Sequence, residues 1–190
     1  MSENNQKNKS PFTVLDLTQI ALLAAIICIL GPLSLPLPFS EVPVSLSIFG
    51  IFLALIVGGL KDGSISILIY ILLGLVGVPV FAGFTGGFAK LAGPTGGYII
   101  GYLPMALVAG LFITLSKRKI AFTILGLILG LAVCYTFGSL WLGISTKMGL
   151  GKAFMVGVIP YIPFDLGKLI ISLLIGIPVQ KAVSKIQNKD

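Results

Sequence analysis

The 190-residue chain is 56% hydrophobic and only 10% charged, with a mean hydropathy of +1.09. Soluble domains carry about 25% charged residues, so this composition excludes a soluble globular protein and predicts an integral membrane protein. At about 20 residues per membrane-spanning helix, the length allows about six helices and no separate soluble domain. The net charge of +7 is divided among loops without an aromatic–basic surface, which argues against nucleic-acid binding.

The first hydrophobic run predicts a helix from Thr13 to Leu30 that ends at Gly31. Residues 1–10 lack the pattern of a cleavable signal peptide and are expected to form a cytoplasmic tail. Ala21 and Ala25 stand four residues apart and leave one face of this helix flat. Such a face favours close approach of another helix, which could belong to this chain or to a partner.

The next segment, PLSLPLPFSEVPV at 32–44, contains four prolines that favour extended backbone and predict a stiff apolar loop at a membrane face. Pro160 and Pro163 divide the last hydrophobic segment, so its continuous helix is expected to begin between Tyr161 and Phe164. The remaining helices are predicted at about Val44–Leu60, Gly63–Leu75, Gly96–Leu115, Ile120–Leu140 and within Ala153–Val179.

The predicted fold is therefore an all-α integral membrane protein with six transmembrane helices and a Gly-rich apolar loop between the third and fourth. Residues 11–182 form its single domain, between cytoplasmic tails at 1–10 and 183–190. In this arrangement nine lysines and arginines lie on the cytoplasmic side and three, Lys90, Lys147 and Lys152, on the other. This imbalance satisfies the positive-inside rule and places both termini in the cytoplasm.

The Gly-rich stretch, GLVGVPVFAGFTGGFAKLAGPTGGY at 74–98, is apolar and yet cannot form a regular helix. Each of its glycines and prolines costs a helix interior about 1–3 kcal/mol, and Lys90 is its one charged residue. Non-helical backbone at membrane depth survives only when it is buried in protein or lines a cavity. We therefore predict the lid or wall of a binding site here. The alternative is a set of turns whose small residues let helices pack closely.

Asp165 and Lys168 are the ionisable residues well inside a predicted span. Their spacing places them on one helix face, and their burial requires that they pair with each other or with a ligand. One interpretation is an ion pair that only steadies the start of the helix. The other is a site with one acceptor and one donor, suited to a small solute with amide-like N–H groups and a carboxylate.

The sequence contains few side chains suited to catalysis. The chain has no histidine, and no nucleophile–base spacing is apparent. The sequence GLGKA at 149–153 lacks the upstream glycine of a phosphate-binding loop. Cys28 and Cys134 lie in apolar runs without metal-ligand spacing, so neither a metal nor a cofactor is expected. A binding or transport role is therefore favoured over an enzyme.

Three motifs resemble the BioY family, the biotin-binding S components of energy-coupling factor (ECF) transporters. They are PLPFSEVPVSL at 36–46, GVPVFAGFTGGFAKLAGPTGGYIIGY at 77–102 and PFDLGK at 163–168, and the similarity covers about residues 12–185. The resemblance implies a six-helix cell-membrane protein that captures biotin from outside. Its partners would be a transmembrane coupling protein and two ATPase subunits.

The resemblance also implies roles for individual residues. Asp165 and Lys168 match residues that contact biotin in this family, and we expect Asp165 to accept from the ureido N–H groups and Lys168 to bind the carboxylate. Ala21 and Ala25 match a face associated with docking to the coupling protein. The loop expected to close over the ligand includes Phe84, Gly86, Gly87, Gly93, Pro94, Thr95, Gly96, Gly97 and Tyr98.

Three other functions remain open at this point. An S component or facilitator for another small carboxylated vitamin would use the same binding chemistry. A membrane-embedded enzyme acting on lipid or peptide would show turnover without ATPase partners. A purely structural partner-binding protein would show no saturable binding of a small molecule.

Overall fold

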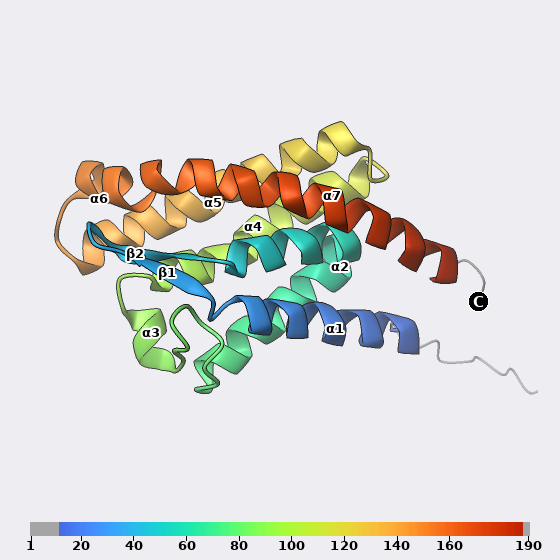
Figure 1. Cartoon of the computed structure of the whole chain (residues 1–190), viewed down its shortest axis with the longest axis horizontal. Helices are drawn as coiled ribbons and strands as arrows, with labels where there is room; N and C mark the ends of the chain where they lie inside the picture. The colour runs from blue at the N-terminus through green and yellow to red at the C-terminus, as the bar shows by residue number, and fades with distance from the viewer. Residues whose placement is uncertain (1–11, 188–190) are drawn as a thin grey trace, which may run out of the picture.

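The computed structural model describes residues 12–187 and shows helices aligned along one long axis (Figure 1). Four segments are long and apolar enough to cross a membrane, namely α2, α4, α5 and the segment containing α6 and α7, and α1 is a shorter apolar helix. In chain order the elements are α1 (Val14–Leu30), β1 (Ser34–Leu37), β2 (Ser40–Ser45), α2 (Ser47–Leu75), α3 (Phe88–Ala92), α4 (Gly96–Leu115), α5 (Ile120–Ser145), α6 (Leu150–Gly157), the 3-10 helix η1 (Ile159–Tyr161) and α7 (Ile162–Gln187).

The first helix starts and stops where local chemistry dictates. The hydroxyl of Thr13 accepts a hydrogen bond from the Asp16 amide, and the Asp16 carboxylate accepts one from the Thr13 amide, both at 3.1 Å. This reciprocal capping box satisfies amide groups that the first turn leaves unpaired. The helix ends at Leu30, as predicted, with Gly31 as its C-cap.

α2 contains both of the helices predicted between residues 44 and 75. Gly59 interrupts it with φ 65° and ψ −152°, a conformation that favours glycine. The hydroxyl groups of Ser47 and Tyr70 lie 3.3 Å apart, whereas 23 residues of straight helix would span about 35 Å. The two halves of α2 therefore run antiparallel as a helical hairpin, which Figure 1 shows directly.

The proline-rich segment has the extended backbone that was predicted, but it forms an antiparallel β-hairpin instead of a stiff apolar loop. β1 and β2 pair Ser34 with Ser45 and Leu35 with Val44, and the register shifts before Leu37 pairs with Ser40. Proline lacks an amide donor but is accepted in edge strands and irregular positions, and a two-stranded hairpin has only edges. The expectation of a purely α-helical chain was therefore wrong in this segment.

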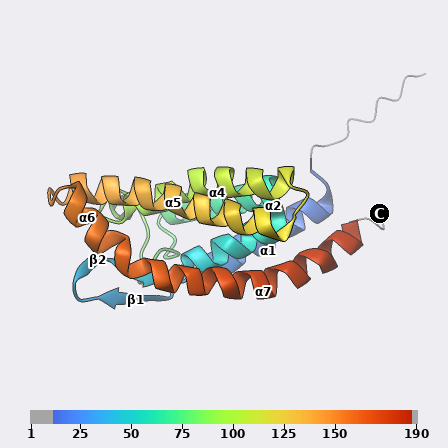
Figure 2. The same cartoon turned by 90° about the horizontal axis from the view of Figure 1, so that it is seen from above.

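The helices pack around α2, which contacts α1, α4 and α7. α4 and α5 lie side by side, and α7 lies on the other side of the bundle (Figure 2). Small residues permit the close approaches: a Cβ added to Gly130 of α5 would lie 2.8 Å from the Met105 carbonyl oxygen of α4. Such packing is how helices associate in a membrane.

The two ends of the bundle differ. Figure 1 shows the start of α1, the α4–α5 turn and the end of α7 at one end, and the β-hairpin, α3 and α6 at the other. α7 begins within the predicted interval and extends to Gln187, beyond the boundary expected for the C-terminal tail. The predicted tail at 1–10 lies outside the described residues. The first end carries Lys61, Lys117, Arg118, Lys119, Lys181 and Lys185, and the second carries Lys90, Lys147 and Lys152.

Candidate functional site

Asp165 and Lys168 lie together at the start of α7, near the β-hairpin end of the bundle. The 3-10 helix η1 turns the chain into α7, so that Asp165 falls in its first turn. The Lys168 ammonium donates to the Asp165 carboxylate at 2.7 Å, and the two residues are 8% and 1% exposed, respectively. A pair so deeply buried must have its remaining hydrogen-bonding capacity satisfied by other groups.

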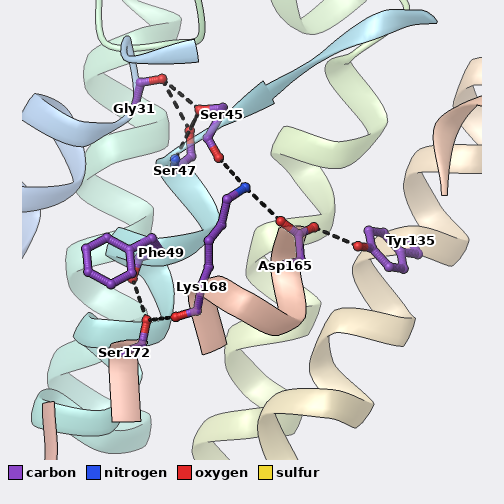
Figure 3. Close-up of polar contacts among 8 residues, drawn as sticks. All are labelled: Gly31, Ser45, Ser47, Phe49, Tyr135, Asp165, Lys168 and Ser172. Carbon is purple, nitrogen blue, oxygen red and sulfur yellow. Dashed lines mark hydrogen bonds and ion pairs between the residues drawn. The ribbon is translucent and has the colours of Figure 1, made fainter. Parts of the chain in front are cut away.

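Those other groups come from elements far apart in the sequence (Figure 3). The Tyr135 hydroxyl of α5 donates to the second Asp165 carboxylate oxygen at 2.6 Å. The Lys168 ammonium also donates to the Ser45 carbonyl of β2, at 2.7 Å. The site thus offers a carboxylate acceptor, an ammonium donor and a hydroxyl within one hydrogen-bonded chain.

The β2 end of this chain is tied to the ends of α1 and α2. The Ser45 hydroxyl donates to the Gly31 carbonyl at 2.8 Å and lies 2.7 Å from the Ser47 hydroxyl. The position of the acceptor for Lys168 is therefore set by the C-terminus of α1 and the start of α2. Hydrogen bonding across elements holds polar groups in place inside an apolar core.

Two adjacent cavities lie at this end of the molecule, and each has a volume of about 40 Å³. Asp165 and Lys168 line the first cavity and Lys90 lines the second. Both volumes are far below the roughly 300–1,000 Å³ of sites that hold drug-sized ligands. The residues that line both cavities are Val42, Pro43, Ser45, Tyr98 and Tyr102.

All five tyrosines of the chain lie around these cavities. Tyr98 donates to the Gly157 carbonyl at 2.8 Å, and Tyr161 donates to the Val42 carbonyl. These bonds close the site by joining α4 to the end of α6 and η1 to β2. Aromatic walls with polar tips suit a ligand that has both apolar rings and hydrogen-bonding groups.

The Gly-rich stretch folds over this end of the molecule. In chain order it contains an isolated β-bridge between Phe81 and Thr85, the short helix α3 and the start of α4. Of the predicted loop residues, Thr95 and Tyr98 line cavities. Phe84 is 67% exposed. Neither Phe84 nor Pro94 lines either of the two cavities.

The predicted loop glycines shape the backbone without lining either cavity. A Cβ on Gly96 would lie 1.6 Å from the Leu91 carbonyl oxygen, and one on Gly97 would lie 2.2 Å from the Trp141 Cβ. A Cβ on Gly86 would lie 2.4 Å from the Val78 carbonyl oxygen, and Gly87 has φ 88°. The Gly93 carbonyl accepts a hydrogen bond from the Trp141 indole at 2.9 Å.

Ala21 and Ala25 are both exposed on α1, so neither is covered by another helix within residues 12–187. They lie away from the two cavities. Their exposure leaves the flat face of α1 accessible to lipid or to a partner. The assignment of this face to docking stays a prediction.

Sequence reasoning missed several cavity residues, among them Tyr135, Ser45 and Lys90. Tyr135 and Ser45 reach the pair only through tertiary packing. A usable signal was present in the tyrosines, because each lies within or beside an apolar segment where its hydroxyl needs a partner. Within residues 12–187, no group of three potential metal ligands is close enough to hold an ion.

Comparisons with known proteins agree with this architecture. Residues 4–185 match the BioY family. A probable biotin transporter BioY of Pyrococcus horikoshii is 38% identical over 161 residues, which cover 85% of this chain and 93% of that protein. The biotin transporter BioY of Thermotoga maritima is 36% identical over 165 residues, 87% of this chain and 95% of that protein.

A crystal structure of the S-component for biotin from an ECF-type ABC transporter superposes with a TM-score of 0.81. The two chains are 32% identical, and the match covers 95% of each. The sequence and structural similarities both extend over nearly the whole chain. The chain therefore belongs to the BioY family.

Proposed function

We propose that this chain is the biotin-binding S component of an ECF uptake transporter, a non-enzymatic substrate-binding subunit. The observation that carries the proposal is the buried Asp165–Lys168 pair, which lines a cavity and is joined by Tyr135. A pair that only steadied the start of α7 would not need to line a cavity. Its relatives are named as biotin transporters, which supports the same ligand.

The chemistry of biotin matches these groups. Its ureido ring presents two N–H donors and one carbonyl acceptor, which complement the Asp165 carboxylate and the Lys168 ammonium. Its fused rings are otherwise apolar and suit the walls formed by Tyr98, Tyr102 and Tyr161. Charge-assisted hydrogen bonds inside a dry site are stronger than neutral ones and provide specificity.

Binding requires the site to open, because the two cavities together are much smaller than a ligand pocket. The walls best able to move are the β-hairpin and the stretch from Val76 to Thr95, since neither is part of a long helix. We expect their outward movement to join the two cavities. Closure over the ligand would then exclude water from the polar groups.

Orientation follows from the charges at the two ends. Counting the two halves of α2 separately gives six spans, with α1 as the shortest. Six described basic residues lie at the end where α1 starts and α7 finishes, against three at the cavity end. By the positive-inside rule, both termini are cytoplasmic and the cavities face the outside. Biotin would therefore enter from the outer side.

The proposed partners are a transmembrane coupling protein and two ATPase subunits, since the sequence lacks a complete phosphate-binding loop. The exposed Ala21 and Ala25 on α1 offer a flat surface for the coupling protein.

The proposal is tested by titrating the purified chain with radiolabelled biotin and competing with other vitamins. We expect saturable binding of one biotin that Asp165→Asn abolishes or greatly weakens. Displacement by another carboxylated vitamin at lower concentration than unlabelled biotin would instead identify an S component for that vitamin. Absence of saturable binding would refute the proposal.

A further inference from the structure

A further cavity lies at the opposite end of the molecule, where the α4–α5 turn and the end of α7 are found (Figure 1). Its volume of about 300 Å³ reaches the lower end of the range for sites that hold small ligands. Its walls combine one isoleucine from each of four helices, Ile56 of α2, Ile113 of α4, Ile120 of α5 and Ile177 of α7, with the polar residues Arg118, Thr123, Gln180 and Lys181. We call it the basic cavity.

Both charged residues that line the basic cavity are cationic. Within residues 12–187, neither Arg118 nor Lys181 forms an ion pair with an acidic residue. Asp62 acts on Arg118 electrostatically but does not line the cavity. The Arg118 Nη1 group donates to the carbonyls of Ile56 and Val57, at 2.7 and 3.2 Å, which fixes its position. Its Nε and Nη2 donors bond to no other described residue and remain for an anion.

A buried hydroxyl also lines the basic cavity without a partner. Thr123 of α5 is 4% exposed, and its hydroxyl makes no hydrogen bond to another residue within 12–187. Burying a hydroxyl without a hydrogen bond is costly. The buried hydroxyls of Ser66 and Ser172, by contrast, donate to carbonyls. A ligand with acceptor oxygens would supply the bond that Thr123 lacks.

The place of the basic cavity indicates the class of anion. The cavity lies at an end of the helix bundle, which is the level of lipid headgroups when the helices span a membrane. Ile120 is 59% exposed, so the apolar wall continues onto the outer surface of α5. Basic pockets between transmembrane helices suit anionic lipid headgroups. A site for a free anion would have no use for four isoleucines.

We infer that the basic cavity binds the phosphate headgroup of an anionic phospholipid, with Arg118 and Lys181 as cationic contacts and Thr123 as a neutral donor. The isoleucines would contact the adjoining part of the acyl chains. One bound lipid would therefore join α7 to α5 and the α4–α5 turn. This inference concerns the end of the molecule opposite Asp165 and does not depend on which solute the chain transports.

The test uses native mass spectrometry of the purified full chain in neutral detergent, titrated with phosphatidylglycerol or phosphatidylcholine. The unaltered chain should bind one phosphatidylglycerol more tightly than phosphatidylcholine. Lys181→Gln and Thr123→Val should each weaken phosphatidylglycerol binding by roughly five- to tenfold, the loss expected for one hydrogen bond to a phosphate. The melting temperature of Thr123→Val without added lipid should not fall, because its hydroxyl has no protein partner to lose.

Lys119→Gln and Thr136→Val are the matched controls, because they remove the same groups from exposed positions outside the basic cavity. Both should leave phosphatidylglycerol binding unchanged. If Lys119→Gln weakened it as much as Lys181→Gln, the attraction would belong to the basic surface as a whole and the inference would be wrong. Equal binding of the two lipids would also refute it. Displacement of phosphatidylglycerol by an equal concentration of inorganic phosphate would identify a free-anion site and overturn the assignment to lipid.

Discussion

Replacing one member of the buried Asp165–Lys168 pair should destabilise the protein far more than replacing both. Each single change leaves a buried charge without its partner, which costs about 3–5 kcal/mol. The double change Asp165→Leu with Lys168→Met removes both charges, and its main cost is the unpaired Tyr135 hydroxyl, about 1–3 kcal/mol. The sum of the single effects should therefore exceed the double effect by at least about 3 kcal/mol.

Thermal unfolding of the purified variants in detergent measures this coupling. A change of 1 kcal/mol shifts Tm by about 2–4 °C at this chain length, so each single variant should melt about 6–20 °C below the parent. The double variant should melt above both single variants and bind no biotin. A double variant that melted lower, by the sum of the two single shifts, would show that the pair is not coupled as the structure places it.

Three further substitutions test other parts of the structure. Tyr135→Phe removes the hydroxyl that donates to Asp165 at 2.6 Å, and biotin affinity measured by radioligand titration should fall by roughly tenfold. Gly97→Ala places a Cβ 2.2 Å from that of Trp141, and thermal unfolding should report a loss of about 1–3 kcal/mol. Ala25→Trp adds bulk to the exposed face of α1 and should reduce co-purification with the coupling protein while biotin binding by the isolated chain is retained.

Matched controls separate these effects from general damage. Gly151→Ala lies where an added Cβ meets no atom within 4 Å, so its melting temperature should not fall. Ala132→Trp alters an exposed alanine on α5 and should leave assembly intact. If Ala132→Trp and Ala25→Trp reduced assembly equally, the docking face would not be specific to α1.

The helix positions could largely be predicted because they depend on local signals. Hydrophobic runs, the stop at Gly31 and the prolines before Phe164 predicted bounds close to those of α1 and α4 and to the start of α7, although α7 ends further along the chain, at Gln187. The β-hairpin could not be predicted in the same way. Its prolines favour extended backbone in any context, and the pairing of Ser34 with Ser45 depends on the register of two strands.

The candidate site could be predicted only in part, for the same physical reason. Asp165 and Lys168 are three residues apart on one helix, so their contact follows from helical geometry. Tyr135 reaches Asp165 from 30 residues away, and that contact depends on how the bundle places α5 relative to α7. The composition of the Gly-rich stretch predicts a wall of the site but does not show which of its residues face the ligand. Tyr98 lines the cavities, whereas its neighbour Gly97 packs against Trp141.

The hydrogen bond from Tyr161 to the Val42 carbonyl implies that the open form of the free protein is a minor population. Tyr161 joins η1 to the β-hairpin, a wall that moves when the site opens, through a single bond to a backbone carbonyl. At about 1 kcal/mol net, breaking this bond leaves an open form populated at roughly one molecule in six. Association would then be about sixfold slower than for a permanently open receptor, and Tyr161→Phe should accelerate capture and release alike.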